Sequence, residues 1–320
     1  MTSKAEYIDY QAGISCIETG YMRPGLASCY LIVQEGRAAL VDTGTWHTVA
    51  RIMAVLEAKG IAPENVDYVM PTHVHLDHAG GAGELMRRFP NAKLVVHPRG
   101  ARHMVDPAKL KAGTISVYGE GAFKRDYVDL VPVSADRVIE AEDGQVIMLG
   151  DRALEIIDTP GHASHHFCVW DETSGGMFTG DTFGLSYREL DVQGRPMVLA
   201  TTTPVQFNPE AWQASLDKMM ARQPSYMFLT HYGRVGDVPR LCADLRAMID
   251  RLADITLSAK NAAQPMDVIR SGVRDCLFES VRQHGVVMSD AELDDLLGMD
   301  IDLDAQGLLV WLERRATSRG

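Results

Sequence analysis

Residues 72–78 read Thr72-His73-Val74-His75-Leu76-Asp77-His78 and directly follow the apolar run 66–71. The run predicts a buried strand that enters a histidine-rich loop. In extended backbone His73 and His75 point to the same side. As the chain turns into the next helix, Asp77 and His78 can face a neighbouring position. Neutral imidazole and carboxylate are the ligands that Zn²⁺, Fe²⁺ and Mn²⁺ accept, so the loop predicts a metal site.

Three later residues are candidates to complete this site, because one loop rarely supplies every ligand of a catalytic metal centre. Each of them follows an apolar run that predicts a strand. His162 ends the segment Asp-Thr-Pro-Gly-His at 158–162, Asp181 follows Thr-Gly at 179–180, and His231 follows Phe-Leu-Thr at 228–230. The three residues are therefore expected to join the histidine-rich loop.

The first 236 residues alternate short apolar runs with turn signals and a few helices. The patterns predict a hairpin from 27–34 and 37–42, helices over 45–59, 79–89 and 209–222, and strands over 66–71, 93–97, 146–149, 152–158, 166–170, 176–180 and 226–229. Residues 98–135 interrupt this rhythm and predict an inserted helical or loop element over a site. Both halves carry strands, a helix and a loop after a strand, which predicts two similar layers packed face to face.

From residue 237 to 320 the pattern is helical, which predicts a C-terminal extension after a catalytic domain of residues 1–236. One amphipathic stripe consists of Leu241, Leu245, Met248, Ile249 and Leu252, and Ser289 with Glu292 forms a capping-box signature. The acidic stretch 290–304 fails as a calcium loop, because Ala305 and Trp311 occupy the positions of the turn glycine and the bidentate glutamate. This stretch is expected to be a solvated surface.

Composition narrows the class of protein further. The chain has 320 residues, 46% of them apolar and 23% charged, with a formal net charge of −12. That balance disfavours nucleic acid and anionic membranes as partners. No apolar run approaches the ~20 residues needed to span a bilayer, and the first ten residues lack the apolar region of a secretory signal, so a cytoplasmic location is expected. The five cysteines are odd in number and lack a Cys-x-x-Cys pair, which indicates reduced packing thiols.

With these motifs, residues 12–235 resemble the metallo-β-lactamase superfamily, specifically its dinuclear, glyoxalase II-like branch. The resemblance implies an α/β (α+β) fold, an αββα sandwich with the metals in a cleft at one edge. It further implies two divalent ions, zinc or alternatively iron or manganese. The first ion would be held by His73, His75 and His162, the second by Asp77, His78 and His231, and Asp181 would bridge both. Asp42, after an early strand, would support a ligand.

The resemblance implies a metal-dependent hydrolase of a small-molecule ester, thioester or lactone, with a metal-bridging hydroxide as nucleophile. Asp77, besides ligating metal, would accept or relay the proton. Two other functions stay open: an iron-dependent sulfur dioxygenase or other redox member, and a metal-bound regulator that acts through the helical extension. The apolar stripe of that extension would pack on the sandwich, line the cleft or form a homodimer.

Departures from known branches leave the substrate open. A bridging carboxylate such as Asp181 is generally absent from true β-lactamases of this fold. Gly184 stands where homoserine-lactone hydrolases often carry a tyrosine, although Tyr187 is near. Residues 184–194 lack the lysine and tyrosine with which glyoxalase II holds glutathione. Among the remaining histidines, structural or solvent roles are expected for His97, His103, His165 and His166. The alternatives are that His165 or His166 contacts a metal ligand and that His97 and His103, which border the insertion, approach the substrate. No role at the site is expected for His47 and His284.

Overall fold

The computed structural model describes residues 5–202 and 206–317, and the chain divides into two compact units. The first unit comprises Met1–Asp158, His165–Gly180 and Pro224–Arg234. The second comprises Thr159–Ser164, Asp181–Gln223 and Val235–Gly320. The second unit thus takes two internal segments as well as the C-terminal region, and the sequence-based boundary after residue 236 stays a prediction.

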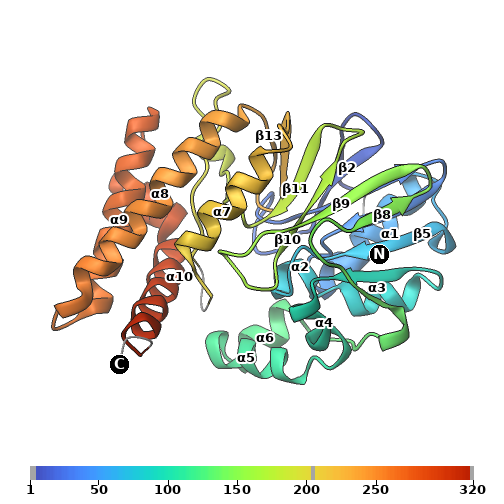
Figure 1. The fold of residues 1–320 in the computed structure, drawn as a ribbon, viewed down its shortest axis with the longest axis horizontal. Helices are drawn as coiled ribbons and strands as arrows, with labels where there is room; N and C mark the ends of the chain where they lie inside the picture. The colour runs from blue at the N-terminus through green and yellow to red at the C-terminus, as the bar shows by residue number, and fades with distance from the viewer. Residues whose placement is uncertain (1–4, 203–205, 318–320) are drawn as a thin grey trace. The chain divides into compact units, whose positions relative to one another are not determined.

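Two sheets form the body of the first unit (Figure 1). One has the order β1 (Tyr7–Asp9), β2 (Ile14–Glu18), β3 (Ser28–Gln34), β4 (Arg37–Val41), β5 (Val66–Met70), β6 (Lys93–Val96) and β7 (Val138–Glu140). The other has the order β13 (Gly233–Val235), β12 (Tyr226–Leu229), β11 (Gly176–Gly180), β10 (Phe167–Asp171), β9 (Arg152–Asp158) and β8 (Val146–Leu149). Strands β4 to β7 run parallel, as do β11 and β12.

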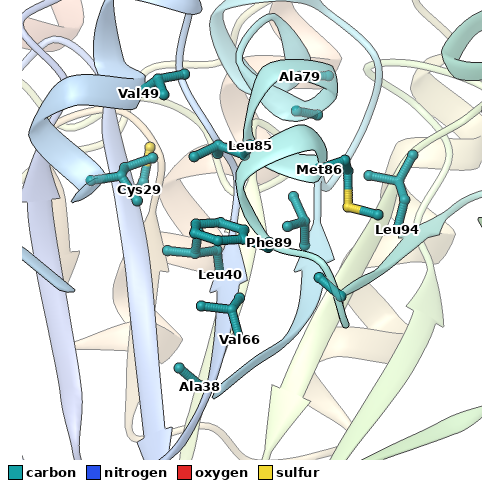
Figure 2. Close-up of a cluster of buried hydrophobic side chains, with 14 of the residues drawn as sticks. Cys29, Ala38, Leu40, Val49, Val66, Ala79, Leu85, Met86, Phe89 and Leu94 are labelled. Atoms are coloured by element: carbon teal, nitrogen blue, oxygen red, sulfur yellow. The ribbon is translucent and has the colours of Figure 1, made fainter. Parts of the chain in front are cut away.

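Successive side chains of β3 point alternately into two apolar layers. In β3, Tyr30 and Ile32 enter the cluster that also holds Phe167 and Phe178 of the second sheet, which fills the sandwich. The intervening residues of β3 face the opposite way, into the cluster formed with the helices that cover the first sheet. Figure 2 shows this second cluster, with Phe89 at its centre. Burial on both faces explains why these strands are almost continuously apolar.

Helices α1 (Val49–Ala58), α2 (Leu76–Ala79) and α3 (Ala82–Arg88) belong to the first unit. The sequence predicted one helix over 79–89, but the chain breaks at Gly80 and Gly81. A Cβ on Gly81 would lie 2.9 Å from the carbonyl oxygens of Thr43 and Thr45. Glycine therefore lets this turn approach the loop after β4, and that approach separates the short helix α2 from α3.

The segment between β6 and β7 is helical. It carries α4 (Pro98–Val105), α5 (Ala108–Tyr118) and α6 (Glu120–Asp126). Phe123 and Tyr127 at its far end are buried against Leu76, which lies inside the histidine-rich stretch. The hydroxyl groups of Tyr127 and Tyr21 lie 2.8 Å apart. The insertion is thus anchored on the loop that carries the candidate ligands.

The second unit contains α7 (Pro209–Met220), α8 (Val238–Ser258), α9 (Pro265–His284) and α10 (Asp290–Thr317), and α10 packs against α8 and α9 (Figure 1). The predicted start of α7 is confirmed, since the Asn208 side chain accepts a hydrogen bond from the Ala211 amide. The capping box before α10 is also confirmed, by the reciprocal bonds of Ser289 and Glu292. Across the described residues, we find no helix with the length and apolar character needed to cross a membrane.

A buried ion pair joins two strands of the second sheet. The Arg152 guanidinium on β9 donates to the Asp171 carboxylate on β10 at 2.9 Å, and both side chains have no exposed surface. Arg152 also donates to the Ala12 carbonyl at 2.6 Å. Removing one partner would leave a buried charge uncompensated, so the two residues depend on each other where β9 pairs with β10.

Candidate metal centre

The loop after β5 brings the first two histidines together. His73 is fully buried, and its Nε2 lies 2.8 Å from Nδ1 of His75. His75 has extended backbone (φ −62°, ψ 149°) where it precedes α2. The prediction that the two rings share one side is therefore confirmed. The loop follows β5 in a run of parallel strands, and ligand sites commonly form beyond the carboxyl ends of such strands.

A second cluster of candidate ligands combines two residues of the short helix α2 with one histidine from the other sheet. The ligand atoms of Asp77, His78 and His231 all lie within 4.8 Å of one another. Asp77 Oδ2 is 3.6 Å from Nε2 of His78 and 3.6 Å from Nε2 of His231. Asp77 and His78 occupy the first turn of α2, whereas His231 follows β12. Within the first unit, the fold thus joins residues from two sheets into one group of metal-ligand type.

Asp42 supports this second cluster from behind. Its Oδ2 accepts from His78 Nδ1 at 3.0 Å and from the Thr230 hydroxyl at 2.5 Å, while Oδ1 accepts from the Thr72 amide at 2.8 Å. The carboxylate is completely buried, and its φ of 58° lies in the left-handed region that aspartate tolerates better than most residues. Asp42 therefore makes the hydrogen bond to His78 that its predicted supporting role requires.

The second unit presents one histidine and one carboxylate side by side. His162 Nε2 lies 3.3 Å from Asp181 Oδ2, and His162 Nδ1 lies 3.0 Å from the Thr201 carbonyl. The loops carrying the pair are tied together, because the Thr182 hydroxyl donates to the Thr159 carbonyl at 3.2 Å. Both side chains of the pair are buried.

The turn before His162 requires glycine. Gly161 has a φ of 142°, and a Cβ there would lie 2.4 Å from the Cβ of Trp212 on α7. The Trp212 indole in turn donates to the Thr182 carbonyl at 2.6 Å. The helix therefore packs directly against the turn and fixes the loop on which His162 stands.

The donor set fits a divalent metal ion. In His78, His162 and His231, Nδ1 lies beside an acceptor oxygen, which favours a proton on Nδ1 and leaves Nε2 with its lone pair. Each Nε2 lies within 3.6 Å of an aspartate oxygen. Buried imidazole and carboxylate groups in this arrangement suit zinc, iron or manganese.

Two further histidines lie beside the first pair. The His165 ring is 6.2 Å from that of His73 and 5.7 Å from that of His75, between ring centroids. The His166 ring is 4.9 Å from that of His73, and a Cβ on Gly180 would lie 2.4 Å from His166 Nε2. The sequence analysis expected one of these two rings near the candidate metal ligands, and in the structure both rings lie beside His73.

The other histidines make local contacts. His97 Nε2 lies 3.1 Å from Asp158 Oδ1 at the end of β9. Partial burial lowers the pKa of His103. His47 and His284 each pair with a backbone carbonyl, at 2.9 and 3.0 Å.

A sandwich with imidazole and carboxylate clusters beyond its strand ends is the architecture of a metalloprotein. The sequence model of the metallo-beta-lactamase superfamily matches residues 22–231, and the chain belongs to this superfamily. The predicted fold class, its αββα sandwich with C-terminal helices, is confirmed with it.

One relative is similar to this chain in both sequence and structure. The chain is 26% identical over 227 residues to the metallo-beta-lactamase fold-containing protein ST1585 of Sulfurisphaera tokodaii, covering 70% of this chain and 79% of that protein. The crystal structure of ST1585 from Sulfolobus tokodaii aligns with a TM-score of 0.64 at 23% identity, over 93% of this chain and 99% of that one.

Two relatives carry enzyme names. The N-acyl homoserine lactonase AttM of Azorhizobium caulinodans is 30% identical over 190 residues, 54% of this chain and 67% of that protein. The hydroxyacylglutathione hydrolase of Maricaulis maris is 31% identical over 148 residues, 46% of this chain and 43% of that enzyme. The second match thus spans less than half of the enzyme concerned.

Proposed function

We propose that this protein is a dinuclear metal-dependent hydrolase of a small ester, thioester or lactone. The observation that carries the proposal is the cluster of Asp77, His78 and His231, whose ligand atoms lie within 4.8 Å of one another. Asp42 holds His78 in the tautomer that a metal requires.

A second ion completes the proposal. His73 with His75 in the first unit and His162 with Asp181 in the second unit are two pairs of ligand type. Neither pair alone makes a firm site, since such ions take about four ligands. We therefore propose that the two pairs hold one ion jointly and that Asp181 is shared between both ions. Zinc is the proposed metal, with iron and manganese as the alternatives that the donors also fit.

Bound divalent ions would lower the pKa of a water molecule toward about 7 and polarise a substrate carbonyl. The chain itself supplies a proton carrier. Asp77 Oδ2 lies 3.6 Å from both neighbouring imidazoles, and the side chain is 23% exposed. This carboxylate is therefore placed to take a proton from the attacking water and to pass it to solvent or to the leaving group.

The substrate class rests on two supports. The named enzymes among the relatives act on an N-acyl homoserine lactone and on a hydroxyacylglutathione, an ester and a thioester. In this chain, Leu76 of the ligand loop packs with Phe123 and Tyr127 of the insertion, so an apolar element adjoins the proposed chemistry. We propose a small acyl compound as substrate.

The test is a hydrolysis screen with esters, thioesters and lactones, on metal-loaded and chelator-treated protein. We expect turnover of at least one class that requires metal and that Asp77→Asn reduces by two or more orders of magnitude. Asp129→Asn is the matched control, because Asp129 pairs with Lys111 at 2.7 Å on the exposed surface of the insertion. Oxygen uptake without hydrolysis would replace the proposal with the redox alternative.

A further inference from the structure

Asp304 is a buried carboxyl group in the middle of α10. Its side chain is 1% exposed, although the acidic stretch around it was expected to be a solvated surface. Asp302, two residues earlier, meets that expectation, since it is about half exposed and pairs with Arg270 at 2.6 Å. Burial raises the pKa of Asp304 well above the usual value. A carboxyl group in such a place costs stability unless its contacts compensate.

Among the described residues, the Asp304 carboxyl group forms its hydrogen bonds with Thr202. Oδ1 accepts from the Thr202 amide at 2.6 Å and lies 3.2 Å from the Thr202 hydroxyl. That hydroxyl also lies 3.1 Å from the Asp304 carbonyl. Within the described part of the chain, Oδ2 is buried without a hydrogen-bond partner. A neutral carboxyl group fits these contacts, because its carbonyl oxygen still accepts both bonds.

The peptide group held by Asp304 also contacts a proposed metal ligand. The Thr202 amide and the Thr201 carbonyl belong to the same planar peptide unit, in which N–H and C=O point in opposite directions. The Thr201 carbonyl lies 3.0 Å from His162 Nδ1. The three groups thus form a continuous chain of hydrogen bonds from α10 to the imidazole, and such chains polarise each bond along their length.

We propose that Asp304 is a positioning residue for the metal centre: it fixes the Thr201–Thr202 peptide, and that peptide holds His162 with its proton on Nδ1 and with Nε2 turned toward the ion. The proposal rests on the proposed function, in which His162 is a ligand. It assigns to the C-terminal helix a role in metal binding beyond packing. His162 Nε2 indeed lies 3.3 Å from the carboxylate of Asp181.

Substitutions at Asp304 test the proposal. Asp304→Asn keeps an acceptor oxygen, whereas Asp304→Ala and Asp304→Val both lack one, so a folding failure in one of them leaves the other. Asp302→Ala is the matched control on the same helix. Cobalt(II) is titrated into the metal-free proteins, and its visible absorption reports on the ligand geometry of each ion. We expect 10–100-fold weaker binding of one ion in the Ala and Val variants, and affinity within about threefold of the parent in Asp304→Asn and Asp302→Ala.

A second measurement separates this proposal from the proposed function. Long-range ¹H–¹⁵N spectra of the metal-free protein report the tautomer of His162. We expect the Nδ1–H form in the parent and a mixture of tautomers in Asp304→Val. A parent protein that binds no metal would refute the proposed function, while these spectra would still decide the role of Asp304. Unchanged tautomer and unchanged cobalt affinity in folded Ala or Val variants would overturn the proposal, as would an Asn variant as impaired as they are.

Discussion

Asp42→Asn changes one buried oxygen of the supporting carboxylate to an amide nitrogen. Asparagine tolerates the left-handed backbone that Asp42 adopts, so the loop keeps its course. The new amide would face His78 Nδ1 and the Thr230 hydroxyl, the two groups that now donate hydrogen bonds to Oδ2. An amide donates to Nδ1, which moves the imidazole proton to Nε2, the atom that would bind metal.

The magnitude follows from the bonds that are lost. Two hydrogen bonds to a charged acceptor contribute about 1.5–3 kcal/mol each, and the Thr230 hydroxyl can recover part of its share by accepting from the new amide. We therefore expect the free energy of unfolding of the metal-free protein to fall by about 2–4 kcal/mol. Loss of the partner that orients a ligating histidine should also weaken binding of one ion about 10–100-fold.

Urea unfolding of the metal-free protein and titration with zinc in competition with a chelator measure the two effects. Asp67→Asn is the control, because Asp67 lies in the same sheet on β5 and pairs with Arg37 near the surface. Its cost should stay within about 1 kcal/mol, without change in metal affinity. An Asp42→Asn variant with parental zinc affinity would refute the reasoning that Asp42 sets the tautomer of His78.

The remaining predictions concern the shared carboxylate, the sandwich and α10. Asp181→Ala should lower the occupancy of both ions and abolish hydrolysis; elemental analysis showing normal metal content together with near-normal turnover would contradict its assignment. Arg152→Met should lower the free energy of unfolding in urea by about 3–5 kcal/mol, because it leaves Asp171 buried and unpaired, whereas Lys124→Met on the exposed face of α6 should stay within about 0.5 kcal/mol. Burial raises the pKa of Asp304 in the folded state, so that state keeps the proton after the unfolded chain has lost it. The free energy of unfolding should therefore fall as the pH rises above about 4. Asp304→Asn should remove this pH dependence, and identical pH profiles of parent and variant would contradict the prediction.

The histidine-rich loop was predictable because its signal is local. His73 and His75 are two residues apart in extended backbone, and Asp77 with His78 begins the next turn, so spacing determines which side chains can meet. Most of the strands were predictable for a similar reason, since apolar runs bounded by turn signals mark buried strands. Strands β1, β2, β7 and β13 were not predicted. The interruption of the helix at Gly80 was not predictable, because it depends on the close approach of this turn to the loop after β4.

Contacts between segments that are far apart in the chain could not be predicted, because no local sequence pattern indicates them. The bond from the Thr230 hydroxyl to Asp42 spans 188 positions, and the bonds from Thr202 to Asp304 span 102. Asp304 itself was expected in solvent, because the acidic stretch has the composition of a surface. Its burial depends on how α10 packs against residues that are distant in the sequence, among them Thr202. Such pairings are set by tertiary packing, which the sequence pattern of one element does not encode.

Metal content at saturation tests the central claim most directly. The metal-free protein would be reconstituted anaerobically with excess zinc, iron or manganese, freed of unbound ions, and measured by elemental analysis against protein concentration. Two pairs and one triad of ligand-type residues predict close to two equivalents of metal per chain. A single firmly bound equivalent after reconstitution with excess metal would contradict the dinuclear site.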